Sequence, residues 1–221
     1  MSSYLMIPGA GGAAWYWHRV VPLLEAAGHE AIAVDLPGPD PTAGLPEYTE
    51  LALAAADGRC DVVLAALSMG AFTAPLVAAR RSLKALVLVN AMIPAPGETA
   101  GQWWDDTGSQ GARVQAAQEG GYSKEFDLDT YFLHDVPAEA LEGGPGPRDE
   151  AAAAFASPCD FTAWPDIPIH VVAGRDDRFF PAEFQRRLAK DRLGVEADVL
   201  PGGHLIALAQ PEPLAQYLLA L

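Results

Sequence analysis

The sequence predicts an α/β protein built on a doubly wound, mostly parallel sheet of six strands. Short apolar runs of four to seven residues alternate with longer segments of amphipathic helical pattern. Such alternation is typical of β–α–β units, in which helices cover both faces of a parallel sheet. Half of the 221 residues are hydrophobic, which supplies the core that this fold has to bury. We expect a single domain over residues 1–221.

The expected strands and helices follow one another along the chain. The apolar runs predict strands at residues 3–7, 31–34, 61–67, 85–89, 169–173 and 195–200. Helical patterns cover residues 15–27, 45–56, 69–81, 182–190 and 205–220. Pro75 lies inside the third of these helices, where its missing amide hydrogen would remove one backbone bond and kink the helix.

The alternation stops between Asn90 and Pro168, in a stretch rich in aromatic, acidic and turn residues. We interpret residues 93–160 as a helical cap inserted after the fourth strand. This cap would cover the carboxyl edge of the sheet, where open α/β sheets bind their ligands. The alternative is a solvated helical excursion without a function.

The net charge of −15 argues against nucleic acid as a partner. Residues 93–160 hold 13 of the 29 acidic residues but only 3 of the 14 basic ones. If these acids lie near a pocket mouth, they would repel anionic substrates. If they lie on the outer face of the cap, they are simply solvated, which is the usual place for charged side chains.

The composition favours a cytoplasmic protein without membrane contact. The first residues lack the basic region and long apolar stretch of a secretion signal, and no run approaches the ~18 apolar residues of a membrane span. Cys60 and Cys159 are far apart in sequence and are expected to be reduced thiols. The sequence makes no prediction of the oligomeric state.

Ser68 is the strongest candidate for a nucleophile. It ends an apolar strand, stands between Ala66 and Gly70, and precedes a helical segment, which resembles a G-x-S-x-G turn with alanine in the first glycine position. Such a turn lifts the serine hydroxyl clear of the sheet and needs small residues two positions away on either side. The helix N-terminus behind the serine offers amide hydrogens to a developing oxyanion.

His204 and Asp177 are the candidate base and acid. The fifth strand runs into GRDDRFFP at residues 174–181, and the sixth runs into PGGH, which ends at His204. Both groups therefore stand at the carboxyl edge of the sheet, like Ser68. A serine hydroxyl needs a base to take its proton, and a carboxylate orients that base. Asp177 is preferred as the acid, and Asp176 remains the alternative. The other histidines are weaker candidates for the base: His18, His29, His134 and His170.

Taken together, the glycine-rich loop at residues 8–12, the serine turn and the two later loops resemble the α/β-hydrolase superfamily. Residues 9–17, 21–29 and 204–211 are similar to the branch of small plant-type methyl esterases and hydroxynitrile lyases. This resemblance implies the α/β-hydrolase fold, the order serine, acid, histidine, and no cofactor or metal. It also implies an oxyanion hole formed by the backbone amides of Ala10 and Met69.

The chain departs from that branch at three positions. Pro8 replaces a histidine that often braces the glycine-rich loop, so the loop must gain its stiffness elsewhere. The lyase members carry a lysine after the catalytic histidine and a threonine in the loop, where this chain has Leu205 and Gly9. Without an ammonium to stabilise a departing cyanide, lyase activity is disfavoured.

Two other functional hypotheses compete with ester hydrolysis. Residues 9–14 also fit a G-x-G-x-x-A dinucleotide fingerprint, with Asp35 at the distance of a ribose-binding carboxylate. That reading finds no tyrosine with a lysine four positions later, and it leaves Ser68 and His204 unexplained. The other reading is a small-molecule receptor that keeps the hydrolase shell, which an intact triad does not exclude.

The sequence therefore predicts a serine hydrolase, carboxylesterase-like, that cleaves a small and largely apolar ester through an acyl-enzyme. Candidate substrate contacts are His18 beside the glycine-rich loop, Trp103 and Trp104 in the cap, and Phe179 after the fifth strand.

Overall fold

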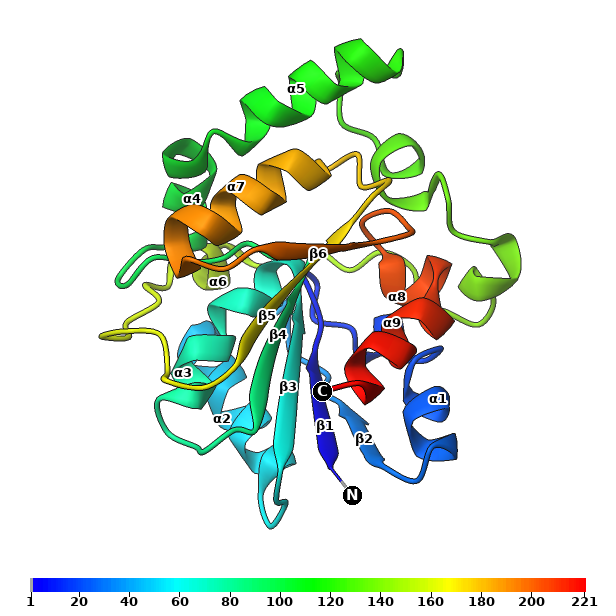
Figure 1. Cartoon of the computed structure of the whole chain (residues 1–221). Helices are drawn as coiled ribbons and strands as arrows, with labels where there is room; N and C mark the ends of the chain where they lie inside the picture. The colour runs from blue at the N-terminus through cyan, green and yellow to red at the C-terminus, as the bar shows by residue number, and fades with distance from the viewer. Residues whose placement is uncertain (1) are drawn as a thin grey trace.

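The computed structural model describes residues 2–221, and its centre is a sheet of parallel strands (Figure 1). The strands are β1 (Ser3–Ile7), β2 (Glu30–Ala33), β3 (Val62–Leu67), β4 (Ala85–Val89), β5 (Ile169–Gly174) and β6 (Ala197–Leu200). They lie in the order β2-β1-β3-β4-β5-β6, and every neighbouring pair is parallel. The predicted fold class is confirmed, and the described sheet is parallel throughout.

The central strands are apolar along their whole length because both of their faces are covered. No residue of β3 has more than 2% of its surface exposed. Leu64 and Ala66 belong to one hydrophobic cluster, whereas Val63 and Ala65 belong to the other. Successive side chains of a strand point to opposite faces, so an uninterrupted apolar run fills both cores.

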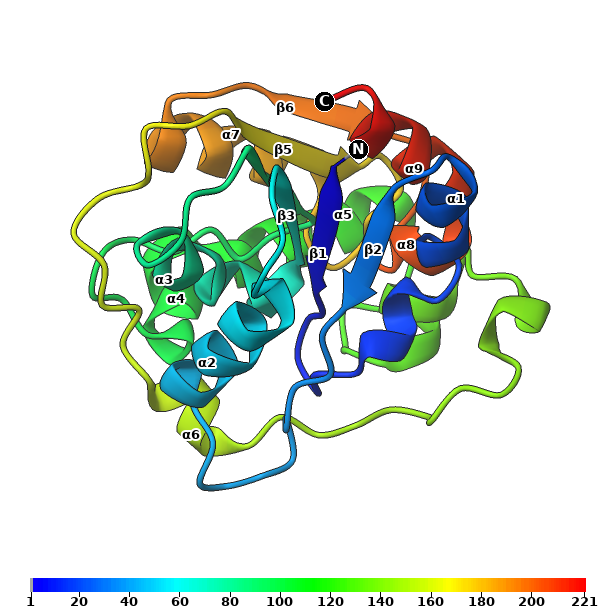
Figure 2. The same cartoon turned by 90° about the horizontal axis from the view of Figure 1, so that it is seen from below.

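Helices cover both faces of the sheet, as Figure 2 shows. Helices α2 (Leu45–Ala56), α3 (Ala74–Ala78) and α7 (Ala182–Leu193) contribute to the cluster that includes Leu64. Helices α1 (Val21–Ala26), α8 (Ile206–Ala209) and α9 (Pro211–Leu219) pack against the opposite face, where α9 supplies Leu214 and Leu218 to the core. Because all neighbouring strands are parallel, their carboxyl ends lie at one edge of the sheet.

Proline marks the start of several helices. At three places the structure has two short elements where the sequence predicts one long helix. The segment predicted as one helix at 69–81 is a 3₁₀ turn at Ser68–Phe72 followed by α3, and Pro75 lies in the first turn of α3. Pro22 and Pro211 likewise begin α1 and α9, which separates α1 from the 3₁₀ turn at Ala14–Trp17 and α9 from α8. In a first turn the missing proline amide breaks no helical bond, so Pro75 starts a helix instead of kinking one.

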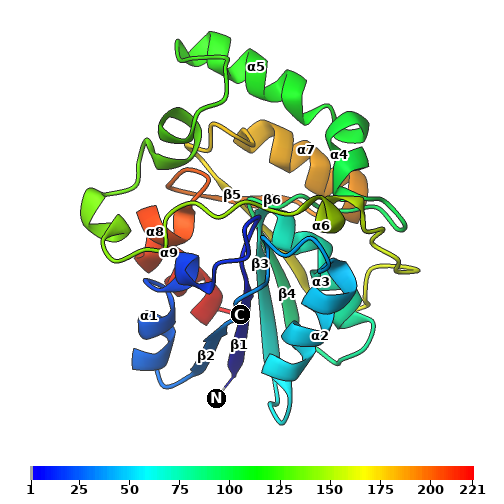
Figure 3. The ribbon, with the colours of Figure 1, turned by 180° about the vertical axis from the view of Figure 1, so that it is seen from behind.

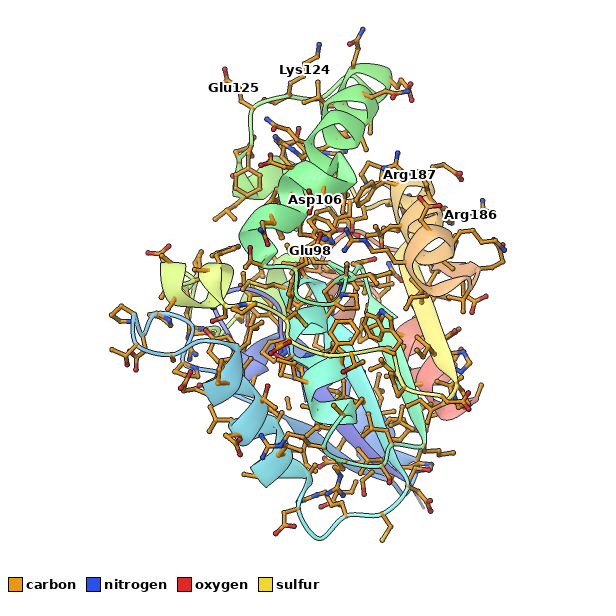
Figure 4. The ribbon with its side chains drawn as sticks, turned by 90° about the vertical axis from the view of Figure 1, so that its left-hand side faces the viewer. Glu98, Asp106, Lys124, Glu125, Arg186 and Arg187 are labelled. Carbon is orange, nitrogen blue, oxygen red and sulfur yellow. The ribbon has the colours of Figure 1, made fainter. Side chains whose placement is uncertain are left out.

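The segment between β4 and β5 forms helices at the carboxyl edge of the sheet. It contains α4 (Ala100–Thr107), α5 (Ser109–Gly120), a π turn at Asp129–Leu133, a 3₁₀ turn at Ala138–Leu141 and α6 (Ala152–Ala156). In Figure 4, Lys124 and Glu125 lie at the end of this segment farthest from the sheet, whereas Glu98 lies near its base. Within residues 2–221, no helix has the length and apolar character that a membrane crossing requires.

Helix α7 anchors this segment to the rest of the molecule. Arg192 donates hydrogen bonds to the carboxylate of Glu98 and, at 2.7 Å, to the carbonyl of Ile93. One turn earlier, Arg187 donates to the carbonyl of Thr107 at 2.8 Å and so ties down the last residue of α4. Glu98 is 7% exposed. A charge buried to this degree needs its partner, so the pair fixes the base of the segment.

Candidate functional site

Ser68 occupies a strained turn between β3 and the following 3₁₀ turn. Its φ is +51°, a left-handed conformation that non-glycine residues rarely adopt. Small residues make the turn possible, because a Cβ at Gly70 would overlap the carbonyl oxygen of Pro8 and a Cβ at Gly9 would lie 3.1 Å from that of Ser68. The carbonyl of Ser68 accepts a hydrogen bond from the Met92 amide at 3.0 Å. The surrounding structure therefore holds the serine in a conformation that it would not adopt alone.

The structure brings Ser68, His204 and Asp177 into one hydrogen-bonded row. The Ser68 Oγ lies 3.0 Å from Nε2 of His204, and Nδ1 of the same ring lies 2.9 Å from Oδ2 of Asp177. An ionised carboxylate only accepts hydrogen bonds, so Nδ1 carries the proton and Nε2 is left as the acceptor for the serine hydroxyl. All three residues are buried, with His204 only 1% exposed. This geometry is that of a nucleophile, a base and an orienting acid.

Asp177, and not Asp176, faces the histidine. The Oδ1 atom of Asp177 accepts the amides of Phe179 and Phe180 at 2.8 and 2.9 Å, and its Oδ2 also accepts Nε2 of Gln185 at 3.2 Å. Asp176 turns outward instead and forms an ion pair with Arg175 at 3.0 Å. The hydrogen bond from that guanidinium is the main reason that the pKa of Asp176 is lowered.

Aromatic rings enclose the imidazole of His204. The ring centroids of Phe132, Phe179 and Phe180 lie 4.7, 5.1 and 5.1 Å from its centroid, and all three meet it edge to face. They shield the ring from bulk water without offering it a competing hydrogen bond. Among the chain's histidines, all within residues 2–221, His204 alone lines the cavity above Ser68.

Asn90 holds together the loops that carry the histidine and the acid. Its Nδ2 donates to the carbonyls of Gly203 and His204, both at 2.9 Å, and its Oδ1 accepts the amide of Gly174 at 2.6 Å. Asn90 is fully buried and has a φ of +44°. No site role was predicted for Asn90, although a polar residue directly after a buried strand at the carboxyl edge of the sheet was a usable signal.

The glycine-rich loop brings Ala10 beside Ser68 and Met69. All three residues line the same cavity. Gly11 and Gly12 have φ values of +83° and +71°, and the Gly12 amide closes a turn to the carbonyl of Gly9 at 3.1 Å. Within residues 2–221, neither the Ala10 nor the Met69 amide donates a hydrogen bond to a backbone carbonyl outside the helices and strands. Both donors thus remain free to bind an oxygen at the serine.

The cavity above Ser68 has a volume of about 270 Å³ and mostly apolar walls. Trp104 and Phe179, two of the predicted substrate contacts, lie in its wall. Sequence reasoning missed most of the others, which come from residues 126–155 and from the 3₁₀ turn at Ala14–Trp17. They are Tyr16, Phe126, Leu128, Phe132, Leu133, Pro147, Arg148 and Phe155. Burial raises the pKa of the Tyr16 phenol.

Two predicted substrate contacts lie elsewhere. Trp103 is fully buried beneath the cavity, where its indole nitrogen donates to the Ile93 carbonyl at 3.0 Å. Neighbouring helical residues point in different directions, so only Trp104 of the pair reaches the cavity. His18 is exposed and stacks on Trp15 at a centroid distance of 4.6 Å. The 3₁₀ turn directs Tyr16 inward in its place.

The acidic residues of 93–160 do not reach the cavity. Its described lining contains no aspartate or glutamate but does contain one guanidinium, that of Arg148. Arg148 forms an ion pair with Asp35 at 3.1 Å. The lining therefore does not support the expectation that these acids repel anionic substrates at the pocket mouth. Charged side chains favour the solvated outer surface.

Several known proteins resemble this chain in sequence or in fold. A probable esterase of Oryza sativa subsp. indica is 34% identical over 111 residues, which cover 44% of this chain and 42% of the relative. The chain thus matches less than half the length of that curated relative. The structure of a pyrethroid hydrolase from Sphingobium faniae JZ-2 superposes with a TM-score of 0.78 at 23% identity, covering 99% of this chain and 96% of that one. A methylesterase from Arabidopsis superposes with a TM-score of 0.75 at 19% identity, covering 100% and 98%.

At these identities, the two solved structures establish a shared fold. The sequence match to a family model reaches further. The model described as the alpha/beta hydrolase family matches residues 4–217, which is nearly the whole chain and includes every residue of the row from Ser68 to Asp177. The predicted resemblance is confirmed, and the chain belongs to the alpha/beta hydrolase family.

Proposed function

We propose that this protein is a serine hydrolase, carboxylesterase-like, that cleaves a small and largely apolar ester through an acyl-enzyme. The observation that carries the proposal is the row from Ser68 Oγ through His204 to Asp177, with links of 3.0 and 2.9 Å, beneath a mostly apolar cavity. The names of the similar proteins, an esterase, a methylesterase and a pyrethroid hydrolase, support ester cleavage.

In the acylation step, Ser68 Oγ attacks the ester carbonyl carbon while Nε2 of His204 takes the hydroxyl proton. Asp177 keeps the proton on Nδ1 and stabilises the imidazolium that forms. The carbonyl oxygen becomes an oxyanion and accepts hydrogen bonds from the amides of Ala10 and Met69. The intermediate then collapses, the bond to the alcohol oxygen breaks, and His204 gives its proton to the leaving alkoxide.

Deacylation reverses these roles. His204 removes a proton from water, and the resulting hydroxide attacks the acyl carbon bound to Ser68. The same two amides hold the second oxyanion. When the acyl–oxygen bond to Ser68 breaks, the serine recovers the proton from His204 and the carboxylic acid leaves. All proton transfers pass through one histidine, which the three phenylalanine rings keep apart from bulk water.

The cavity argues for an apolar acyl or alcohol group of modest size. Its volume of about 270 Å³ and its aromatic walls favour rings or branched chains over long polar substrates. We also propose that residues 93–160 act as a cap within one domain of residues 1–221, because this segment supplies Trp104, Phe126, Phe132 and other wall residues.

We propose a cytoplasmic location as well. It rests on Cys60 and Cys159, both of which are free thiols.

Labelling with a fluorophosphonate tests the nucleophile. Ser68 Oγ should displace fluoride from phosphorus, so that intact mass spectrometry of the wild type shows one adduct and that of Ser68→Ala shows none. Ser68→Ala should also lower kcat for p-nitrophenyl acetate by at least about 10⁴-fold, because removing a triad member costs several powers of ten. Hydrolysis that persists in a folded Ser68→Ala variant would contradict the assignment.

The same experiment separates the remaining readings. A folded wild type that forms no adduct and turns over no ester would favour a small-molecule receptor on a hydrolase shell. Cyanide release from a cyanohydrin without ester hydrolysis would favour a lyase. Nothing in the lining favours that outcome, because Leu205 and Gly9 line the cavity at the positions where lyases carry lysine and threonine.

A further inference from the structure

We propose that Glu150 is a positioning residue for ester hydrolysis, which holds the glycine-rich loop so that the Ala10 amide faces the reacting oxygen. This inference rests on the proposed function. Glu150 lies in residues 138–151, the return segment, which leads into α6 within the proposed cap. Figure 3 shows this segment, in yellow-green, crossing the carboxyl ends of the strands.

The contact between Glu150 and the loop is direct. The Gly11 amide donates to Oε2 of Glu150 at 2.5 Å, although the two residues are 139 positions apart in sequence. The Gly11 amide belongs to the peptide group that begins at the carbonyl of Ala10. Fixing that peptide restricts the rotation of the Ala10 backbone, on whose other side lies the amide assigned to the oxyanion.

The backbone around Glu150 is fitted to the loop as closely as its side chain. A Cβ on Gly11 would lie 2.5 Å from the carbonyl oxygen of Arg148, and a Cβ on Gly38 would lie 2.5 Å from the Gly11 carbonyl carbon. The amide of Ala151 donates to the carbonyl of Gly38 at 2.7 Å. Gly11 is therefore enclosed between the return segment and the loop after β2, and Glu150 supplies the hydrogen bond at this junction.

A second partner sets the orientation of the Glu150 carboxylate. The hydroxyl of Tyr48, on α2, donates to Oε1, which leaves Oε2 directed at Gly11. Tyr48 is 3% exposed and belongs to the hydrophobic core. The brace thus runs from the core of the sheet through Tyr48 and Glu150 to the loop, and it supplies stiffness that Pro8, with no hydrogen-bonding side chain, does not offer.

The Glu150 carboxylate is partly buried, which is an unfavourable place for a charged group without hydrogen-bond partners. Burial raises the pKa of Glu150, while the hydrogen bonds from Tyr48 and Gly11 oppose the shift. Within residues 2–221 this half-buried acid forms no ion pair. It is held by these two bonds, and one of them ends on the loop that carries Ala10. A merely solvated acid would face outward, as Glu139 and Glu142 of the same return segment do.

The decisive comparison is between Glu150→Ala and Glu150→Gln in the full-length protein. Glu150→Ala should lower kcat by about 10- to 100-fold with little change in KM, because a displaced donor weakens binding of the transition state more than binding of the substrate. Glu150→Gln keeps an amide oxygen for Gly11 and should restore most of the loss. Glu142→Ala, an exposed acid in the same segment, is the matched control and should leave kcat unchanged.

Two measurements separate positioning from general destabilisation. Affinity for a trifluoromethyl ketone, which forms a tetrahedral oxyanion with Ser68, should fall in Glu150→Ala in parallel with kcat/KM, whereas affinity for an acid product should not. Hydrogen exchange of a peptide covering residues 8–12, followed by mass spectrometry, should be faster in Glu150→Ala than in the wild type. The exchange measurement does not depend on turnover.

Several results would overturn the inference. The first is that Glu150→Ala has the same kcat and the same loop exchange rate as the wild type. The second is that Glu150→Ala and Glu150→Gln lose equal amounts of kcat and both have a lower Tm. If the wild type itself shows neither ester turnover nor a fluorophosphonate adduct, the proposed function fails separately. Loop exchange then still decides the matter, because faster exchange in Glu150→Ala supports the brace and unchanged exchange refutes it.

Discussion

At the scale of single residues, the site depends on side chains that bond to backbone groups. Asn90 bonds to three backbone groups of the loops that carry the histidine and the acid, and Glu150 bonds to the amide of Gly11. Ser68 itself is held at a positive φ by its neighbours. Asn90 is fully buried and has no water to replace a lost partner, so its hydrogen bonds restrict the backbone to one arrangement.

The substitution Asn90→Asp replaces the donor Nδ2 by an oxygen and so tests whether Asn90 holds these loops. A carboxylate cannot donate to the carbonyls of Gly203 and His204, which lie 2.9 Å from Nδ2 in the structure. We expect the free energy of unfolding to fall by about 1–3 kcal/mol, with a lower kcat because the loop of His204 shifts. Denaturant unfolding and steady-state kinetics measure the two effects.

The exposed amide of Gln110 provides the control for the same chemical change. Gln110→Glu should alter the unfolding free energy by no more than about 0.5 kcal/mol. If Asn90→Asp is as stable and as active as this control, Asn90 does not hold the loops.

At the scale of elements, backbone conformation separates α4 from α5. Gly108 ends α4 and precedes α5 with a φ of +67°, whereas Gly111 lies inside α5 with no unusual φ. A Cβ at either glycine would meet no atom within 4 Å. Packing therefore has no part in the difference between the two positions, and only backbone conformation remains.

Alanine substitutions at these two glycines, three residues apart, should change the free energy of unfolding in opposite directions. Gly111→Ala should raise the unfolding free energy by about 0.5–1 kcal/mol, because alanine loses less backbone entropy in a helix than glycine does. Gly108→Ala should lower it by about 1–2 kcal/mol, because a left-handed conformation strains a residue with a Cβ. Urea unfolding of both variants checks the signs, and two changes of the same sign would contradict the argument from backbone conformation.

At the scale of the whole molecule, the cap and the sheet share buried contacts. Cys159 is fully buried at this junction, where its thiol donates to the carbonyl of Phe72 at 3.0 Å and its amide donates to the carbonyl of Glu98 at 2.9 Å. Burial raises the pKa of the Cys159 thiol. Cys60, in contrast, is exposed. The reactivity of Cys60 therefore reports on the exposed surface, and that of Cys159 reports on whether the junction is closed.

Thiol titration with Ellman's reagent should distinguish them. One thiol should react quickly in the native protein and two in denaturant, because the thiolate is the reactive form and both burial and a raised pKa suppress it at Cys159. Cys60→Ser should abolish the fast phase, and Cys159→Ser should leave it intact. Two fast thiols in the native protein would show that the junction opens readily.

Much of this molecule follows from local sequence patterns. The strands at Ser3–Ile7 and Ala85–Val89 and the helix at Leu45–Ala56 coincide with the predicted ranges, because their apolar periodicity is strong and their ends are marked by turn residues. Prediction was poorer where proline begins a helix inside an amphipathic pattern, as at Pro75 and Pro211. There the hydrophobic period continues while the backbone hydrogen bonds do not.

The sequence alone determined the order of strands and helices and placed Ser68, Asp177 and His204 at one edge, because parallel strands all end on the same side of a sheet. Only the tertiary structure decided which side chains line the cavity and which brace its loops. Tyr16, Arg148 and Glu150 gain their roles from neighbours far away in sequence. The packing of the cap against the sheet sets those neighbours, and no local period encodes that packing.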